Sequence, residues 1–314
     1  MNHRVRTGQA KTSGIKKLIW LIVLLGIMIL IIRIVGSRRG GSIVSPIPDE
    51  AKETTSILTS WFAKKKSPDD LRKKIQERVN NRWKNYSVYI KDFTSDFTMG
   101  INETVIFTAA SVNKVPIVAA LYYYAGKGEI DLDERVTVQA ADIQDFGTGS
   151  IRYDPPGSVY SLKTLAKLAI EQSDNTAGYV LGNYTVGLDR VQALMTQWGL
   201  TQTDMVNNKT SNRDMAILFE KIYKGEVINA ASTQEMLAFF KDTDFEDRLP
   251  ALLPKTAMVY HKIGNEIAVM HDVGIVTDGK TTYYIGVLGS DITDEEEAKK
   301  IIAEISKLVY EYLK

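Results

Sequence analysis

The residues with the clearest chemical potential are Ser111 and Lys114, which lie in the stretch FTAASVNKVPIVAALYYYAG at 107–126. Residues i and i+3 of a helix share a face, so the lysine amine would reach the serine hydroxyl. A partly desolvated lysine beside other cations can accept a proton near neutral pH and so activate a serine nucleophile. At a helix start, the serine N–H could also join an oxyanion hole. The alternative is an N-cap serine with a solvated lysine, and the spacing alone does not decide.

A second group, Ser173, Asp174 and Asn175, lies at the end of a helical run. A hydroxyl there could relay a proton to a leaving nitrogen, and an amide could hold a substrate carbonyl. The alternative is a turn or capping cluster, because Ser, Asp and Asn all favour such places.

The third group is Lys262, Ile263 and Gly264, on an expected strand. The lysine could direct a cation into a cleft, while the bare glycine would let a ligand approach the backbone. Taken alone, the same residues would equally describe a solvated lysine on an edge strand.

Together and in this order, the three groups resemble the motifs of the class A β-lactamase and penicillin-binding serine hydrolase family, S-x-x-K, S-D-N and K-T-G. The resemblance covers about residues 67–314. Two motifs match in full, and the third is K-I-G. The resemblance implies acyl transfer from a β-lactam, or from the D-Ala-D-Ala end of a wall peptide, to a serine. We expect no cofactor, and the three histidines are too scattered in sequence for a metal site.

Carried over by position, the resemblance assigns a role to each matching residue. Ser111 would attack the carbonyl and Lys114 would take its proton. Ser173 would pass a proton to the leaving nitrogen. The charge of Lys262 would act on Ser173 and would also hold the substrate carboxylate. The backbone N–H groups of Ser111 and Asn265 would form the oxyanion hole. The other substrate-binding residues would be Asn175 for a side-chain amide, Gly264, whose bare backbone a ligand can approach, and His271 for the carboxylate.

One departure from the family concerns release of the acyl group. Class A enzymes carry a glutamate on a long loop, which positions the deacylating water. The corresponding interval here is only TQTDMVNNKT, residues 201–210, and Asp204 is its sole acid. An acid must reach the water before its pKa matters. We therefore expect an enzyme that reacts with β-lactams and releases them slowly.

The other departure is Ile263, where family members have a hydroxyl that helps to bind the substrate carboxylate. A branched apolar side chain cannot make that hydrogen bond. His271 on the next strand could compensate when protonated, although a packed or Asp272-paired histidine fits the sequence as well. His261 is expected to be structural, because it points to the opposite face of the strand from Lys262.

Three functions stay open on the sequence. The first is a membrane-anchored serine hydrolase of class A β-lactamase type with slow deacylation. The second is a penicillin-binding D,D-peptidase-like enzyme on wall peptides, and the third is a catalytically silent wall-binding module. A net charge of +1 gives no case for a nucleic-acid partner, and the sequence does not reveal the oligomeric state.

The N-terminal part of the chain predicts a membrane anchor. Residues 18–36 are apolar apart from Arg33, and this segment is long enough for a spanning helix. No signal-peptide cleavage pattern follows it. More basic residues precede the span than follow it, so residues 1–17 would form a cytoplasmic tail. Residues 37–66 are typical of a linker, here leading to an extracytoplasmic catalytic domain at 67–314. The chain has no cysteine, which excludes disulfides and thiol chemistry.

The hydrophobic pattern predicts an α+β fold of the β-lactamase/transpeptidase-like type, preceded by one transmembrane helix. Helices are expected from Ser67 and at the C-terminus, around one five-stranded antiparallel sheet. Two of its strands come early, at 86–93 and 97–107, and three come late, from 256 onward. A helical lobe at about 111–250 would be inserted between them, leaving a cleft between sheet and lobe.

Overall fold

The computed structural model describes residues 67–314. The tail at 1–17, the anchor at 18–36 and the linker at 37–66 that the sequence predicts lie outside this part of the chain. Within residues 67–314, no helix is long and apolar enough to cross a bilayer. The prediction of a single-pass membrane protein with a transmembrane helix and an extracytoplasmic domain is therefore corrected: membrane anchoring is not supported.

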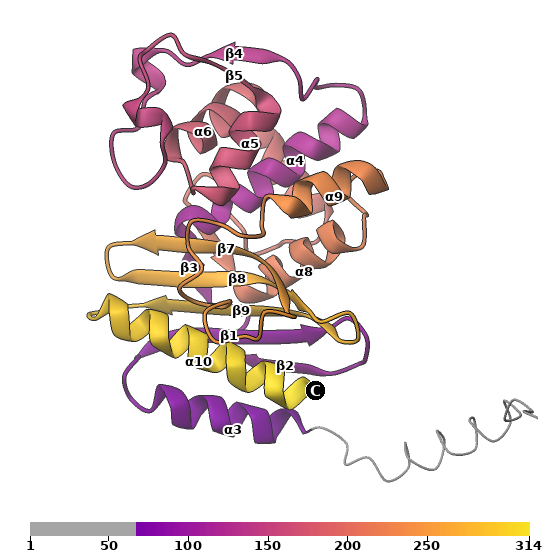
Figure 1. The fold of residues 1–314 in the computed structure, drawn as a ribbon, viewed down its shortest axis with the longest axis vertical. Coiled ribbons are helices and arrows are strands. Elements are labelled where there is room, and N and C mark those ends of the chain that lie inside the picture. The colour runs from indigo at the N-terminus through magenta and orange to yellow at the C-terminus, as the bar shows by residue number, and fades with distance from the viewer. Residues whose placement is uncertain (1–66) are drawn as a thin grey trace, which may run out of the picture. The chain divides into compact units, whose positions relative to one another are not determined.

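A five-stranded antiparallel sheet forms the centre of the fold, in the order β2-β1-β9-β8-β7 (Figure 1). Early and late segments of the chain meet in it, as the sequence predicts. Strand β7 lies at one edge, beside the helical part of the molecule. The strands are β1 (Asn85–Asp92), β2 (Thr98–Ile101), β7 (Met258–Glu266), β8 (Val269–Thr277) and β9 (Thr282–Ser290).

The first and last helices cover one face of this sheet (Figure 1). Helix α3 (Pro68–Val79) begins where predicted, with Ser67 as N-cap and Pro68 at the first position. Helix α10 (Glu295–Leu313) is capped by Asp294, and three glutamates lie in its first turn, where the helix dipole favours them. The prediction of a sheet flanked by terminal helices is confirmed.

The expected second strand at 97–107 is divided in the structure. Only Thr98–Ile101 joins the main sheet, and β3 (Ile106–Thr108) pairs instead with β6 (Lys209–Ser211). Asn102 takes a left-handed conformation, with φ of 52°, and its carbonyl accepts the N–H of Val105. This turn redirects the chain, and β3 delivers it to the start of the helical part.

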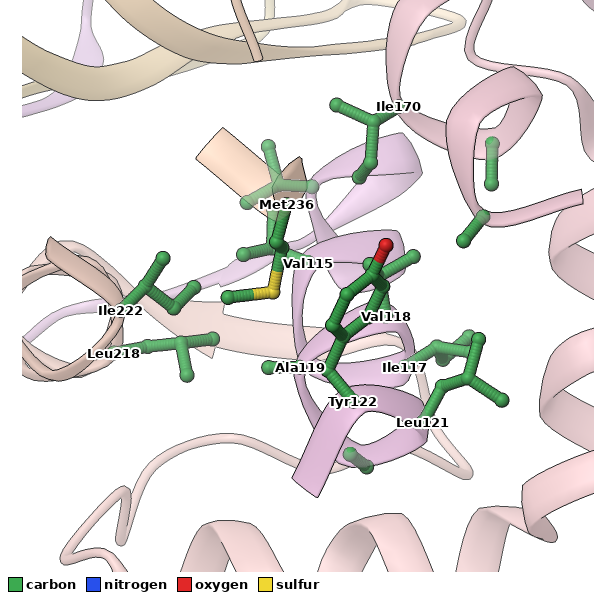
Figure 2. Packing of buried hydrophobic residues seen from close by; sticks show 14 of the residues in the cluster. Val115, Ile117, Val118, Ala119, Leu121, Tyr122, Ile170, Leu218, Ile222 and Met236 are labelled. Carbon is green, nitrogen blue, oxygen red and sulfur yellow. The ribbon is translucent and has the colours of Figure 1, made fainter. Parts of the chain in front are cut away.

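Between β3 and β7 the chain is mainly helical, and α4 (Lys114–Gly126) lies at its centre. All residues from Lys114 to Tyr122 are buried, as expected for a helix that is apolar on every side. Figure 2 shows side chains of three neighbouring helices, among them Ile170, Leu218 and Met236, around the α4 side chains. These helices are α5 (Leu162–Glu171), α8 (Asn212–Tyr223) and α9 (Ala230–Ala238).

The other elements complete this helical part. A small two-stranded antiparallel sheet lies at its outer end (Figure 1), and a segment of π-helix continues α6. These elements are β4 (Arg135–Thr137), β5 (Val159–Ser161), α6 (Asn175–Tyr179), η4 (Val180–Val186) and α7 (Leu188–Gln197).

Candidate active site

Ser111 lies in a single turn of 3-10 helix, η1 (Ala110–Asn113), at the entry to α4. The residue before it, Ala110, has φ of 49°, which is costly for a residue with a Cβ and persists only where the surroundings enforce it. Strand β3 holds the chain on one side of η1, and the buried helix α4 holds it on the other. The serine side chain is partly exposed, so a substrate can reach it.

Lys114 is the first residue of α4, and its side chain is 5% exposed. Its Nζ donates to Ser111 Oγ at 2.7 Å, to the Ser173 carbonyl at 2.8 Å and to Asn175 Oδ1 at 2.8 Å. Burial lowers the pKa of Lys114 from 10.5 to about 7, although the Asp174 carboxylate acts in the opposite direction. A Cβ at Gly178 would lie 2.8 Å from Lys114 Cε, so this glycine lets α6 pack close against the lysine.

Ser173 connects Lys114 to a second lysine. Lys262, on β7, donates from Nζ to Ser173 Oγ at 2.8 Å and to the Ile263 carbonyl at 3.0 Å. Lys262 is fully buried, and burial, followed by the charge of Lys114, lowers its pKa well below the usual value. The structure thus joins residues 111, 114, 173 and 262 in one chain of hydrogen bonds between η1, the start of α6 and the edge strand.

Asn175 is held by the loop at 143–151. Its Nδ2 donates to the Phe146 carbonyl at 2.9 Å, and its own N–H donates to the Thr148 carbonyl at 3.2 Å. Gly147 and Gly149 both have positive φ, of 71° and 114°. A Cβ at Gly149 would lie 2.5 Å from the Cα of Asp174, so a larger residue would separate the loop from the site.

Asp174 fastens the same loop, a role that the sequence did not distinguish from capping. Its Oδ1 accepts the N–H of Ala177 as the N-cap of α6, and its Oδ2 accepts the N–H of Ile151, both at 2.9 Å. The side chain is buried. One carboxylate therefore orients both Asn175 and the loop that holds it.

We expect Asp174→Ala to destabilise the protein by about 2–4 kcal/mol, because it removes an N-cap and leaves buried N–H groups unpaired. Urea denaturation of the variant would measure this change. The matched control is Asp294→Ala, which removes the exposed N-cap of α10, with its one bond to Glu297, and should cost about 1 kcal/mol. Equal losses in the two variants would contradict the assigned role of Asp174.

The outer edge of β7 faces η1. The N–H of His261 leaves the sheet at this edge and donates to the Phe240 carbonyl at 2.8 Å. Backbone groups alternate in direction along a strand, so Ile263 and Asn265 turn their N–H to the same edge. A Cβ at Gly264 would lie 3.0 Å from the Ala109 carbonyl. This close approach places β7 directly against the residues that lead into η1.

His271 does not face a substrate, which corrects the prediction that it binds the carboxylate. The side chain is fully buried, its Nε2 donates to the Thr108 carbonyl at 2.7 Å, and its Nδ1 accepts the N–H of Gly289 at 3.1 Å. Burial lowers its pKa to about 4, so the ring is neutral at physiological pH. His271 instead ties β3 to the sheet just before η1.

The short segment 201–210 packs against the back of η1. Asn113 Nδ2 donates to Asn208 Oδ1 at 2.8 Å, and the N–H of Ala109 donates to the Asn208 carbonyl at 2.8 Å. The carboxylate of Asp204 accepts the N–H groups of Val206 and Asn207 and is occupied within its own turn. Asn208 was not singled out from the sequence. Its φ of 53° is left-handed, and an asparagine just before a strand is a sequence signal for such a turn.

Comparison with known proteins gives consistent matches. The family described as the beta-lactamase enzyme family matches residues 70–313. The beta-lactamase VEB-1 of Pseudomonas aeruginosa is 22% identical over 270 residues, which is 78% of this chain and 90% of that protein. A beta-lactamase of Bacteroides uniformis is 25% identical over 292 residues, 83% of this chain and 96% of the other.

Solved structures agree with these matches. The structure of PBP-A is 29% identical and has a TM-score of 0.72, covering 78% of this chain and 96% of that one. A mutant of PBP-A, solved as an acyl-enzyme complex with penicillin G, is 28% identical with a TM-score of 0.73 over the same shares. A beta-lactamase from Chitinophaga pinensis is 25% identical, with a TM-score of 0.74 over 78% of this chain and 100% of the other.

Proposed function

The chain belongs to the beta-lactamase enzyme family, and on this basis we propose that it is an active-site serine hydrolase that opens β-lactam amides through an acyl-enzyme on Ser111. One observation carries the proposal. The Nζ of Lys114 lies 2.7 Å from Ser111 Oγ, and its pKa is lowered to about 7. A base must be within hydrogen-bond reach of the proton that it removes and must be neutral near the working pH.

Acylation follows from the hydrogen bonds of the site. Ser111 Oγ attacks the carbonyl carbon while its proton passes to the neutral amine of Lys114. The N–H groups of Ser111 and Asn265 stabilise the oxyanion of the tetrahedral intermediate. When the C–N bond breaks, Ser173 Oγ gives its proton to the leaving nitrogen and takes in return the proton that Lys114 removed from Ser111, since Lys114 Nζ lies 3.4 Å from Ser173 Oγ. Lys262, whose Nζ donates to the same Oγ at 2.8 Å, stabilises the charge that develops on it.

Within residues 67–314, deacylation has no comparable base. The acceptors bonded to Lys114 Nζ are two hydroxyls, a backbone carbonyl and a side-chain amide, so no carboxylate of the described residues shares this group. Asp204, the one acid of segment 201–210, is bound within its own turn. We therefore propose that the ester on Ser111 is hydrolysed slowly.

A second candidate is a penicillin-binding D,D-peptidase-like enzyme that acts on the D-Ala-D-Ala end of wall peptides. Two observations favour it, namely the likeness to PBP-A at 29% identity and the missing deacylation base. Both candidates share the acylation step and differ in the fate of the acyl group. A wall-binding module without catalysis would not account for the 2.7 Å contact between Lys114 Nζ and Ser111 Oγ.

We expect a fluorescent penicillin to form one covalent adduct, which peptide mapping by mass spectrometry would place on Ser111. After a chase with unlabelled penicillin, the adduct should persist for hours. Rapid turnover of the chromogenic β-lactam nitrocefin would contradict slow deacylation. Release of D-alanine from a peptide ending in D-Ala-D-Ala would favour the second candidate. Absence of both adduct and hydrolysis would contradict catalysis and favour the binding module.

A further inference from the structure

A cluster of buried charges lies on the face of β7 and β8 opposite to Lys262. His261 and Asp272 are fully buried, and Arg248 is 1% exposed. Glu246 reaches the cluster from the segment before β7. None of these side chains belongs to the hydrogen-bond chain from Ser111 to Lys262. Because charged groups are costly to desolvate, their burial here indicates a structural or functional role.

The ring of His261 is held between two carboxylates. Its Nδ1 lies 2.8 Å and 3.0 Å from the two oxygens of Asp272. Its Nε2 lies 3.2 Å from Glu246 Oε1 and 3.3 Å from Thr243 Oγ1, whose hydroxyl also donates to Glu246 Oε1 at 3.1 Å. A neutral imidazole has one N–H and would turn a lone pair toward one of these carboxylates. The geometry therefore fits an imidazolium that donates from both nitrogens. Burial alone would lower the pKa of His261, but Asp272 and Glu246 outweigh it and raise the pKa to about 9.

This imidazolium fastens the edge strand of the catalytic cleft. The segment 240–249 is bound to β7 by the hydrogen bond from His261 N–H to Phe240, and to β8 by the bond from Leu249 N–H to Asp272 Oδ2 at 3.0 Å. A Cβ at Gly274 would lie 2.7 Å from His261 Cα, so the two strands meet closely here. The next residue along β7 is Lys262, and Asn265, whose N–H we propose for the oxyanion hole, follows three residues later.

The same cluster acts on Lys262 through its charges. Asp272 raises the pKa of Lys262, and Arg248 lowers it. Arg248 donates from Nη1 to the His271 carbonyl at 3.0 Å; burial lowers its pKa, against the carboxylates of Asp272 and Asp247 and, more weakly, those of Glu295 and Glu296. An imidazolium at position 261 offsets the charge of Asp272. Loss of its proton would leave Asp272 less neutralised beside Lys262.

We propose that protonated His261 is a positioning residue for acylation: paired with Asp272 and Glu246, it holds β7 so that Lys262 and the N–H of Asn265 keep their places in the cleft. The inference rests on the proposed function. The acylation rate should then fall at alkaline pH, because β7 loses the His261–Asp272 and His261–Glu246 ion pairs when the imidazole ring loses its proton. The groups that face the ring are Asp272 from β8 and Glu246 from the preceding segment, with Arg248 beyond Asp272 and Lys262 on the same strand.

The test is the rate of acylation by a labelled penicillin between pH 6 and 10.5. The wild-type rate should decline with a midpoint near the His261 pKa of about 9. In His261→Asn, the amide can still donate to Asp272, but the charge and the Glu246 contact are lost. We expect a rate about 10- to 100-fold below wild type at pH 8, as small displacements in an active site produce, and no decline at the wild-type midpoint.

Glu246→Gln is the second variant, and it keeps the histidine. Glu246 raises the pKa of His261, so its removal should move the alkaline decline to lower pH. The Glu246 side chain is 44% exposed, so we expect the fold to tolerate this substitution even if His261→Asn destabilises it. A merely structural cluster would lower the rate without moving the midpoint.

NMR of the imidazole nitrogens reads the charge of the ring without any acylation. The chain has three histidines, and comparison with His261→Asn assigns the signal. Protonation of both nitrogens at pH 8 is expected. A neutral ring at pH 8, or an unchanged decline in both variants, would overturn the inference. If the wild type forms no adduct on Ser111, the proposed function fails instead, and the NMR titration still decides the charge of His261.

Discussion

Ser111→Ala should abolish covalent attachment of penicillin while leaving the fold intact. The alanine has no nucleophilic oxygen, and the other serine bonded to Lys114, Ser173, is fully buried. Lys114 keeps the Ser173 carbonyl and Asn175 Oδ1 as acceptors, both at 2.8 Å, so this buried donor is not stranded. Intact-mass spectrometry after incubation with penicillin would measure the loss. Thermal unfolding should report a stability within about 1 kcal/mol of wild type.

The matched control for Ser111→Ala is Ser158→Ala, which removes an exposed turn hydroxyl bonded to the Pro155 carbonyl. This variant should be labelled as fast as wild type. A penicillin adduct on Ser111→Ala, at any site, would show that another residue is the nucleophile.

Much of the fold could be predicted because its signals are local. Alternation along the strands and the Ser67–Pro68 start of α3 indicated the sheet and its covering helix. The division of the second strand could not be predicted, because it depends on the left-handed turn at Asn102 and on pairing of β3 with β6, a segment distant in the sequence. The pattern around Phe107 is the same whether the partner is β1 or β6.

The candidate site divides in the same way. Residue types and spacing brought Ser111, Lys114, Ser173 and Lys262 forward, and the structure joins them by hydrogen bonds. His271 was misjudged, because the sequence indicates its strand position but not its burial or its bonds to the backbone of Thr108 and Gly289.

The sequence indicated a lowered pKa for Lys114, through partial desolvation beside other cations, but not the packing that produces it. The largest cause is burial, and α6 packs close against the lysine at Gly178. Close packing of this kind depends on which helix lies against which. The charge of Asp174 opposes the shift, so the amine is neutral near pH 7 only because desolvation prevails.

This balance sets the pH dependence of the reaction. The base must be neutral, so the acylation rate should be low when Lys114 is protonated and rise as the pH passes through about 7. A penicillin-labelling profile from pH 5 to 8.5 would measure the midpoint. A midpoint near the ordinary lysine value of 10.5 would contradict neutral Lys114 as the base.

Lys114→Met should remove this ascending limb and slow acylation by about 10²- to 10⁴-fold at pH 8, the range that a positioned general base contributes. Lys114→Arg should be equally slow, since a guanidinium stays protonated. The control is Lys163→Met, which removes a surface lysine paired with Glu235 and should keep the wild-type rate.

Stability should change in the opposite direction to activity in Lys114→Met. The folded pKa of Lys114, about 7, lies below the unfolded value of 10.5, so folding disfavours the charged amine. This cost is fully present below pH 7 and disappears as the pH rises through 10.5. Methionine carries no charge to bury, so the variant should unfold at a higher temperature than wild type at pH 6, and the difference should shrink at pH 10. Thermal melts at both pH values would measure it. The hydrogen bonds of Nζ to Ser173 and Asn175 are lost at either pH, so a stability difference that does not change between pH 6 and pH 10 would contradict a desolvated catalytic lysine.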